Sequence, residues 1–277
     1  MNKYKTQKIN KEKIKVIPTT TDNPKEILGY DIIPRLYANI FICAQKRSGK
    51  TNVIHKILER CINKETGVFV FAATHDIDEN WKYIKQEFEQ KGIKAVFFSA
   101  IEEEKTNNLQ GVLDFMKNSL VSETDEKKQD KLSDFIQVVK FDYNTKKTNI
   151  KVKSPKKKSP KFMIVFDDMT TELKNKDIGK LLKTFRHYKS KVIVSTQWPN
   201  DVKPEARKQF DFFLLFGGHS KEKLEVLYKD MGISDISFDK FYEIYTIVTQ
   251  EKYQFLDVNQ HTGELRRNFD EKIIISH

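Results

Sequence analysis

Largely apolar runs alternate with helical stripes along most of the chain. Short β-rich runs of this kind are typical of strands buried on both faces in parallel sheets, and they occur at 39–44, 67–73, 95–98, 162–166, 192–197 and 210–216. Between them, apolar residues recur at helical spacing in the segments 53–62, 77–88, 108–120, 178–188 and 224–231. Strands that alternate with helices predict an α/β fold, with a mostly parallel sheet and helices on both faces.

The last third of the chain departs from this alternation. Apolar residues at 238–248 follow Ser237, which predicts a capped helix. The runs 253–258 and 265–269 flank a polar stretch that contains Thr262 and Gly263. This pattern predicts a C-terminal β-hairpin.

Two lysine-rich segments interrupt the globular pattern. Residues 1–35 begin with closely spaced lysines and continue into a turn-rich stretch, which indicates a basic N-terminal arm. Residues 121–161 break the strand–helix rhythm, and the block 144–161 within them carries many lysines and no acidic residue. We expect a mobile basic insertion at about 121–161 within a domain that spans 36–277. Contact with a DNA backbone and a solvated loop are equally compatible with that insertion.

A phosphate-binding loop joins the first strand to its helix. Except for its first position, the octapeptide fits the pattern G-x-x-x-x-G-K-[ST], whose backbone N–H groups and helix N-terminus bind phosphates. We assign nucleotide contacts to all eight of its residues: Ala44, Gln45, Lys46, Arg47, Ser48, Gly49, Lys50 and Thr51. Lys50 is expected to reach the β- and γ-phosphates of ATP, and the Thr51 hydroxyl is expected to hold Mg²⁺. Because Ala44 replaces a glycine, the loop should enter at negative φ.

Polar side chains end two of the other predicted strands. Asp167 and Asp168 follow the run 162–166, and Gln197 ends the run 192–197. Strand tips are where α/β sheets present their ligands. We therefore assign Asp167 to Mg²⁺, Asp168 to the attacking water, and Gln197 to sensing the γ-phosphate.

The composition limits the class of protein and of partner. The chain has 277 residues, 38% hydrophobic content and a formal charge of +11, which allows a substantial core and suggests a polyanionic partner. Its two cysteines, Cys43 and Cys61, are predicted to be buried and reduced. The six histidines lie at no metal-ligand spacing, so we expect no structural metal. No apolar run has the length of a membrane span, so we expect no membrane association.

The order of these motifs resembles that of the poxvirus-type DNA-packaging ATPases of large double-stranded DNA viruses, within the FtsK–HerA superfamily of P-loop translocases. The resemblance covers roughly residues 36–270 and rests on five segments: the phosphate loop, Val165-Phe-Asp-Asp168, Phe185-Arg-His-Tyr188, Val194-Ser-Thr-Gln197 and Phe212-Phe-Leu-Leu-Phe-Gly-Gly218. One departure concerns the second carboxylate, because Asp168 stands where many members of the superfamily carry glutamate.

This resemblance implies a RecA-like sheet in which the Gln197 strand lies between the phosphate-loop strand and the Asp167 strand. It also implies a homo-oligomeric ring that hydrolyses ATP between subunits and moves double-stranded DNA into a preformed capsid. A capsid or portal protein would then be a further partner. We would expect the protein in the host cytoplasm at the site of virus assembly, or associated with the virion.

Hydrolysis between subunits requires an arginine that offsets the charge developing on the γ-phosphoryl group. Arg186 is the first candidate for this arginine finger and Arg207 the second, while Arg47 in the phosphate loop could act within its own subunit. Each of these residues could equally form a surface salt bridge.

Other functions share parts of the pattern. A P-loop kinase acting on a small molecule would use the same loop but form a phosphorylated product. A non-catalytic DNA-binding protein would tolerate loss of Lys50, and another DNA translocase of the superfamily would move DNA without packaging it.

Overall fold

A single nine-stranded sheet forms the centre of the protein, for which this computed structural model describes residues 24–104, 106–121 and 157–275. Its strand order is β11-β10-β9-β8-β1-β7-β6-β2-β3. The six strands from β8 to β3 pair in parallel, and β9, β10 and β11 add an antiparallel extension. The strands are β1 (Asn39–Cys43), β2 (Gly67–Ala72), β3 (Ala95–Phe98), β6 (Phe162–Asp167), β7 (Ser190–Thr196), β8 (Phe212–Phe216), β9 (Phe255–Asn259), β10 (Leu265–Arg267) and β11 (Glu271–Lys272).

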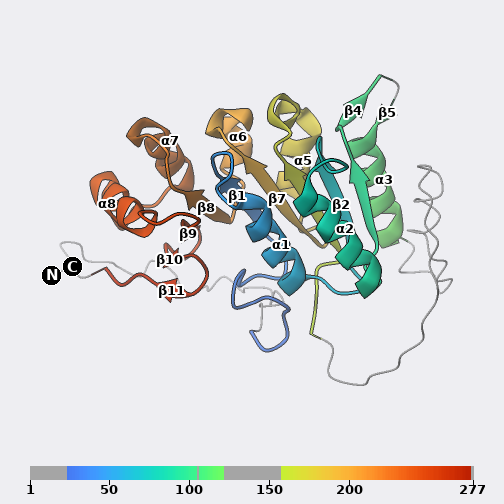
Figure 1. Cartoon of the computed structure of the whole chain (residues 1–277), viewed down its shortest axis with the longest axis horizontal. Coiled ribbons are helices and arrows are strands. Elements are labelled where there is room, and N and C mark those ends of the chain that lie inside the picture. The colour runs from blue at the N-terminus through green and yellow to red at the C-terminus, as the bar shows by residue number, and fades with distance from the viewer. Residues whose placement is uncertain (1–23, 105, 122–156, 276–277) are drawn as a thin grey trace, which may run out of the picture.

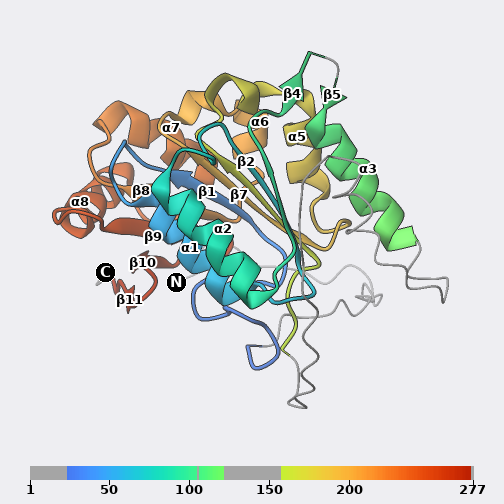
Figure 2. The same cartoon turned by 45° about the vertical axis from the view of Figure 1, so that its right-hand side comes forward.

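Helices cover both faces of this sheet (Figures 1 and 2). The helices α1 and α2 lie side by side on one face, and α3, α5, α6, α7 and α8 pack against the other. They span Lys50–Cys61 (α1), Glu79–Lys91 (α2), Asn108–Val121 (α3), Lys176–Thr184 (α5), Pro204–Arg207 (α6), Lys221–Met231 (α7) and Phe238–Val248 (α8). Two short 3₁₀ helices, η2 (Thr170–Lys174) and η3 (Pro199–Asp201), follow β6 and β7.

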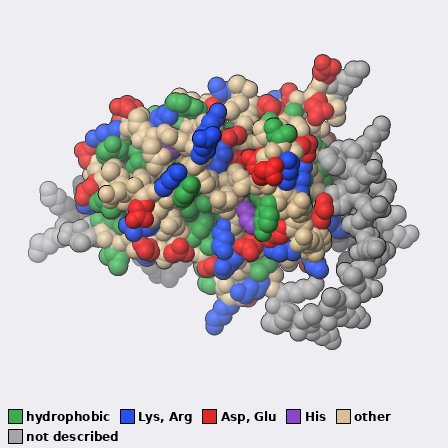
Figure 3. All heavy atoms as spheres, viewed as in Figure 1, with side chains coloured by type: hydrophobic (Ala, Val, Ile, Leu, Met, Phe, Trp, Pro, Cys, Tyr) green, Lys and Arg blue, Asp and Glu red, His purple; other side chains and the backbone are tan. Residues whose placement is uncertain are grey.

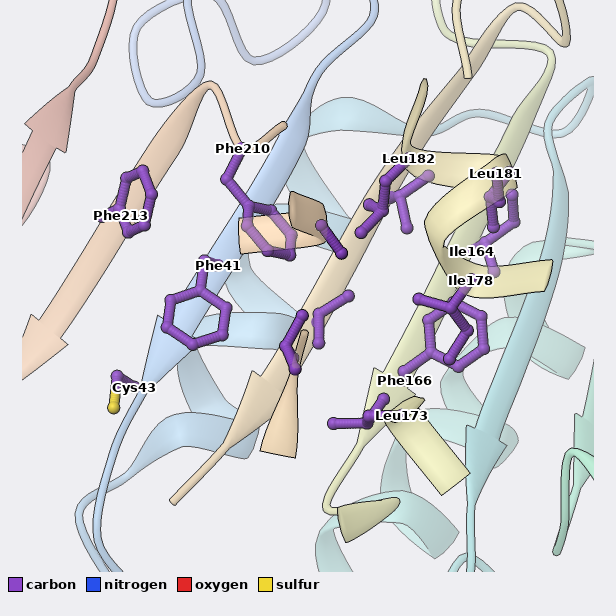
Figure 4. Packing of buried hydrophobic residues seen from close by; sticks show 14 of the residues in the cluster. Phe41, Cys43, Ile164, Phe166, Leu173, Ile178, Leu181, Leu182, Phe210 and Phe213 are labelled. Carbon is purple, nitrogen blue, oxygen red and sulfur yellow. The ribbon is translucent and has the colours of Figure 1, made fainter. Parts of the chain in front are cut away.

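Alternation along the strands divides the core into two layers. In β1, Ile40 and Ile42 point to the α1–α2 layer, whereas Phe41 and Cys43 point to the opposite layer. Figure 4 shows the second layer, where Phe41 packs against Phe210 with ring centroids 5.0 Å apart. Because both faces of β1 are fully buried, this strand and the loop that leaves it have a rigid base.

The structure confirms the predicted α/β class, the parallel sheet and the C-terminal hairpin. The Gln197 strand, β7, lies between β1 and β6, as the family resemblance implied. Ser237 caps α8 by accepting a hydrogen bond from the Lys240 N–H, as predicted. The small hairpin of β4 (Glu102–Glu103) and β5 (Thr106–Asn107) was not predicted, because its strands are only two residues long and exposed.

The segment before β1 packs on the domain from residue 24 onward, although the sequence placed residues up to 35 in an arm. Ile27, Ile32 and Ile33 are buried. Arg266 of β10 donates hydrogen bonds to the carbonyl oxygens of Asp31 and Ile32. The predicted arm can therefore include at most residues 1–23, which lie outside the described residues.

Most of the predicted basic insertion, residues 122–156, also lies outside the described part of the chain. Its final residues pair with the segment that precedes β1: Lys158 exchanges backbone hydrogen bonds with Glu26 and Leu28. The Lys158 ammonium also lies 2.6 Å from a Glu26 carboxylate oxygen. At least this one lysine of the block is thus paired with an acidic residue.

The surface drawn in Figure 3 mixes basic and acidic side chains over the described part of that face. The net positive charge of the chain therefore does not form one continuous patch there. Among the described residues, no helix combines the length and the apolarity needed to cross a lipid bilayer.

Candidate nucleotide-hydrolysis site

The phosphate loop connects β1 to α1 with two residues at positive φ. Arg47 has a φ of 60° and Gly49 a φ of 87°. Gly49 is the residue directly before α1, so the N–H groups of the first helical turn are left to bind an anion. Ala44 is fully buried and its φ is not positive. This agrees with the expectation for a residue that carries a Cβ. Its N–H donates to the Thr196 carbonyl oxygen at 3.0 Å, which joins the loop to β7.

Strand alternation places the acidic and polar groups on the same layer as α1. Met163 and Val165 of β6 belong to the α1–α2 layer, and Asp167 follows at the same parity. In β7, Ile193 faces this layer, so Ser195 and Gln197 follow on the same side. Since β1, β7 and β6 are parallel neighbours, their carboxyl ends bring Lys50, Asp167, Asp168 and Gln197 to one edge.

Lys50 lies between the two carboxylates. Its ammonium forms an ion pair with Asp168 and lies 4.0 Å from Asp167 Oδ1. The Gln197 amide donates to Asp168 Oδ2 at 3.5 Å. We call Lys50, Asp167 and Asp168 the phosphate-side cluster. The structure thus brings together four of the residues that the sequence proposed for catalysis and metal binding.

Asp168 adopts an unusual backbone conformation for a non-glycine residue, with a φ of 53°. Its N–H donates to the Ser195 carbonyl oxygen at 3.1 Å, so β7 holds the turn at the end of β6. Aspartate tolerates this left-handed region better than most residues. The turn separates the two neighbouring side chains: that of Asp167 is 7% exposed and that of Asp168 36% exposed.

Asp167 receives a hydrogen bond that the sequence did not predict. The indole N–H of Trp81 in α2 donates to Asp167 Oδ2 at 3.1 Å. The sequence predicts Trp81 only as one residue of the apolar stripe in segment 77–88, yet a buried indole N–H usually has a hydrogen-bond partner. This requirement is the one sequence signal that could have indicated a polar partner for Trp81. Trp81 contacts only Oδ2, so the second carboxylate oxygen of Asp167, Oδ1, receives no hydrogen bond from the indole.

Several buried polar atoms at this edge have no hydrogen-bond partner among the described residues. They include Oδ1 of Asp167, Oδ1 of Asp168 and the hydroxyl of Ser48. An unsatisfied buried group of this kind costs about 1–3 kcal/mol, so several together indicate a place that a ligand completes. A hard cation and phosphate oxygens would satisfy these atoms, because carboxylate and hydroxyl oxygens are ligands that Mg²⁺ prefers.

Burial sets the protonation behaviour of the cluster. It raises the pKa of Asp167, and the nearby Lys50 ammonium opposes this shift. It also lowers the pKa of Lys50, and the charge of Asp167 opposes that change. Each charge therefore stabilises the other in a site largely removed from water. Among the described residues, no group of three or more His, Cys, Asp or Glu side chains is arranged to hold a metal.

Two of the three candidate arginines, Arg186 and Arg207, lie outside the phosphate loop that contains Arg47. Arg186 follows α5 and precedes β7, at the amino edge of the sheet, where its exposed guanidinium lies 3.6 Å from Asp211. Since β7 has seven residues, Arg186 is separated from Gln197 by about 20 Å along the strand. Arg186 could therefore act only on the nucleotide of a neighbouring subunit.

The structure gives Arg207 partners within its own subunit. This side chain is buried, and its Nε lies 2.5 Å from Asp230 of α7. Its Nη1 donates to the carbonyl oxygens of Pro199 and Val202. These bonds commit the guanidinium to its own subunit and give Arg207 a structural role at the turn after Gln197. Arg207 lies in a four-residue helix that has no apolar stripe, so the local sequence does not indicate that its side chain is buried.

His219 is a further residue near the site that the sequence did not single out. It is buried at the end of β8, and its Nε2 lies 3.0 Å from the Cys43 carbonyl oxygen. The Tyr245 hydroxyl accepts from the His219 backbone N–H and donates to the Phe216 carbonyl oxygen. Burial lowers the pKa of His219, so the neutral ring is favoured. These bonds tie β8 to the base of the phosphate loop.

Comparison with known proteins connects this geometry to a family. Residues 127–262 match the family described as Poxvirus A32 protein. The matched range includes β6 with Asp167 and Asp168 and β7, but it begins after the phosphate loop. No curated protein matches the chain.

The fold is similar to that of solved structures of two viral proteins. One is the genome-packaging NTPase B204 from Sulfolobus turreted icosahedral virus 2 in complex with AMPPCP, with 15% identity and a TM-score of 0.51 over 87% of this chain and 100% of that one. Another is B204, the DNA-packaging ATPase from Sulfolobus turreted icosahedral virus, with 16% identity and a TM-score of 0.50 over 86% and 98% of the two chains. These structural matches confirm the predicted fold. The match of residues 127–262 agrees with the predicted resemblance to the poxvirus-type family over that range.

Proposed function

We propose, on the premise that this chain is a relative of the Poxvirus A32 protein, that it is an ATPase that drives double-stranded DNA into a preformed viral capsid. The observation that carries the proposal is the convergence of Lys50, Asp167, Asp168 and Gln197 at one edge, beside buried oxygens that lack partners among the described residues. The names of the structural relatives, a genome-packaging NTPase and a DNA-packaging ATPase, support the link to DNA.

The proposed hydrolysis assigns one role to each residue. The loop N–H groups and Lys50 bind the β- and γ-phosphates, and Thr51 and Asp167 hold Mg²⁺. Bound there, Mg²⁺ would neutralise charge on the phosphate oxygens. Asp168, which is more exposed than Asp167, positions the attacking water and accepts its proton.

Asp168 must first exchange its partner. In the described structure its Oδ2 pairs with Lys50 and accepts from Gln197. When a γ-phosphate takes over the Lys50 ammonium, this carboxylate is released toward water. Gln197 can then donate to a phosphate oxygen, and its own backbone leads into the turn that Arg207 holds.

In a homo-oligomeric ring, a neighbouring subunit would complete the site by supplying an arginine. We propose Arg186 as the finger, because its guanidinium is exposed and lies at the opposite edge of the sheet from its own Lys50. Arg186→Ala should abolish turnover, and mixed assemblies of this variant with Lys50→Ala should recover part of it. Failure to recover any activity at all mixing ratios would rule out a finger in trans.

The direct test is ATP hydrolysis by the purified protein, with and without long duplex DNA, over a range of protein concentrations. A packaging motor predicts turnover that rises with protein concentration and is stimulated by DNA. Formation of a phosphorylated small molecule in place of free phosphate would support the kinase alternative. Absence of nucleotide turnover under every condition would refute the proposal.

A further inference from the structure

A hollow lies beside the phosphate loop, on the side away from the catalytic carboxylates. It has a volume of about 340 Å³ and is bordered by three segments: the loop residues 45–48, the end of β8 at 216–218, and residues 249–254 between α8 and β9. Because β8 flanks β1 on the side opposite β7, this hollow and the Asp167 edge lie on either side of the loop. Its volume is within the range of small-molecule sites.

Close contacts hold the walls of this hollow in place. The Gln45 side-chain amide donates to the Gly218 carbonyl oxygen, so the phosphate loop is tied to the end of β8. A Cβ on Gly217 would lie 3.0 Å from the Thr249 carbonyl oxygen, which means that β8 and the 249–254 segment approach each other closely. The Thr249 hydroxyl donates to the Tyr245 carbonyl oxygen at 2.8 Å and anchors the same segment to α8. The hollow is therefore preformed.

Tyr253 stands at the junction of the hollow and the phosphate loop. Its side chain approaches Gly49, where an added Cβ would lie 3.1 Å from Tyr253 Cδ1. The residue is nevertheless 59% exposed and has a φ of 71°, which is strained for an aromatic residue. Such strain persists where the surrounding structure enforces it, and it is concentrated at ligand sites. Here it holds a flat aromatic surface open to solvent next to the phosphate loop.

The charges around the hollow favour an anionic ligand. Lys46, Arg47 and Lys252 line it, against the single acidic side chain of Glu251. The Lys252 ammonium lies 5.1 Å from the centroid of the Tyr253 ring, so a cation and an aromatic surface are presented together. A ligand with phosphates on one side and a planar ring on the other would fit both features.

We propose that this hollow holds the ribose and base of the nucleoside triphosphate, and that Tyr253 stacks on the base. The inference rests on the proposed function, since the phosphates must occupy the loop for the base to reach Tyr253. Stacking is tolerant of base identity, because every nucleobase has a π-face. The site would thus add affinity for nucleotides over bare polyphosphates, with little choice among bases.

The test compares Mg²⁺-AMPPCP with magnesium tripolyphosphate by titration calorimetry on the full chain. Wild type should bind the nucleotide more tightly than the polyphosphate. Tyr253→Ala should weaken nucleotide binding about tenfold, which corresponds to about 1.4 kcal/mol, because base stacking is lost, and it should leave polyphosphate binding unchanged. Tyr253→Phe should bind as wild type does.

A matched control is Tyr83→Ala, which removes a tyrosine of similar exposure, 61%, on the distant helix α2. This variant should bind both ligands as wild type does. Equal affinity of wild type for the two ligands, or equal weakening of both by Tyr253→Ala, would overturn the inference and leave the proposed ATPase intact. Binding of neither ligand by folded wild type would refute the proposed function itself.

Discussion

Two buried clusters of opposite charges differ in how completely their polar atoms are paired. In the pair formed by Arg207 and Asp230, the guanidinium donates to Asp230 and to two backbone carbonyl oxygens. In the phosphate-side cluster, Oδ1 of Asp167 and Oδ1 of Asp168 have no hydrogen-bond partner among the described residues. Both clusters lie within the same subunit and contain one cationic side chain.

The difference separates a structural role from a functional one. A buried charge must be paired and hydrogen-bonded, or it destabilises the fold. The Arg207–Asp230 pair meets this condition alone, so it needs no ligand. The phosphate-side cluster meets it only in part, so its unpaired carboxylate oxygens raise the free energy of the site, and a cation with phosphates can lower it. Changes in the first cluster should therefore affect stability, and changes in the second should affect turnover.

The largest expected effect is on turnover, in Asp168→Asn. An amide cannot accept the proton of the attacking water, so the rate of ATP hydrolysis should fall by about 10²–10⁴-fold. Nucleotide binding should persist, because Lys50, Thr51 and Asp167 are unchanged. Phosphate-release kinetics and a parallel binding titration measure the two quantities. Wild-type turnover in this variant would remove Asp168 from the mechanism.

The next effect is on stability, in Arg207→Met. It leaves the Asp230 carboxylate buried without its partner, which should lower the free energy of unfolding by about 3–5 kcal/mol. The double variant Arg207→Met with Asp230→Leu should recover part of this loss, because it removes both charges. Urea unfolding measures the change. Unaltered stability combined with lost turnover is the opposite pattern, and it would restore Arg207 as an arginine finger.

The smallest effect is a shift in pH dependence, in Trp81→Phe. Burial raises the pKa of Asp167, and the Trp81 hydrogen bond favours its ionised form. Mg²⁺ requires that form, so affinity for Mg²⁺-nucleotide should fall on acidification at a pH above the usual aspartate range. Loss of the indole N–H should move this midpoint to higher pH and weaken Mg²⁺ binding about 10–100-fold.

The stability of the nucleotide-free protein should respond to pH in the opposite direction. Because the folded pKa of Asp167 is raised above the unfolded value, its contribution to stability is present below the unfolded pKa and lost as pH rises through the folded pKa. Thermal unfolding and nucleotide titrations over the same pH range provide both curves. Parallel curves, or a midpoint that Trp81→Phe leaves in place, would show that Asp167 does not bind the metal.

Local sequence was sufficient to predict the parts of the site that lie on single elements. The strand, loop and helix that hold Lys50 are contiguous in the chain, and Asp167 and Asp168 directly follow a strand that is recognisable by its apolar run. Parallel strands then bring these tips to one edge without further information. The same reasoning located Gln197, because it ends the apolar strand β7.

Contacts between distant segments could not be predicted in this way. Trp81 reaches Asp167 across 86 positions of sequence, and helical spacing shows only that its ring is buried. Local sequence does not indicate that Arg207 is buried and donates to carbonyl oxygens of residues 199 and 202. The docking of residues 24–38 depends on Arg266, which is 234 positions away from Ile32. Turn composition in that segment gave no sign of the contact.

The most direct test of the central claim is a crystal structure with Mg²⁺ and AMPPCP. We expect Mg²⁺ to be bound by the Thr51 hydroxyl and Asp167 Oδ1, with Lys50 moved from Asp168 to the phosphates and Asp168 turned toward a water. A nucleotide whose phosphates lie away from Lys50, or a metal held without Asp167, would contradict it.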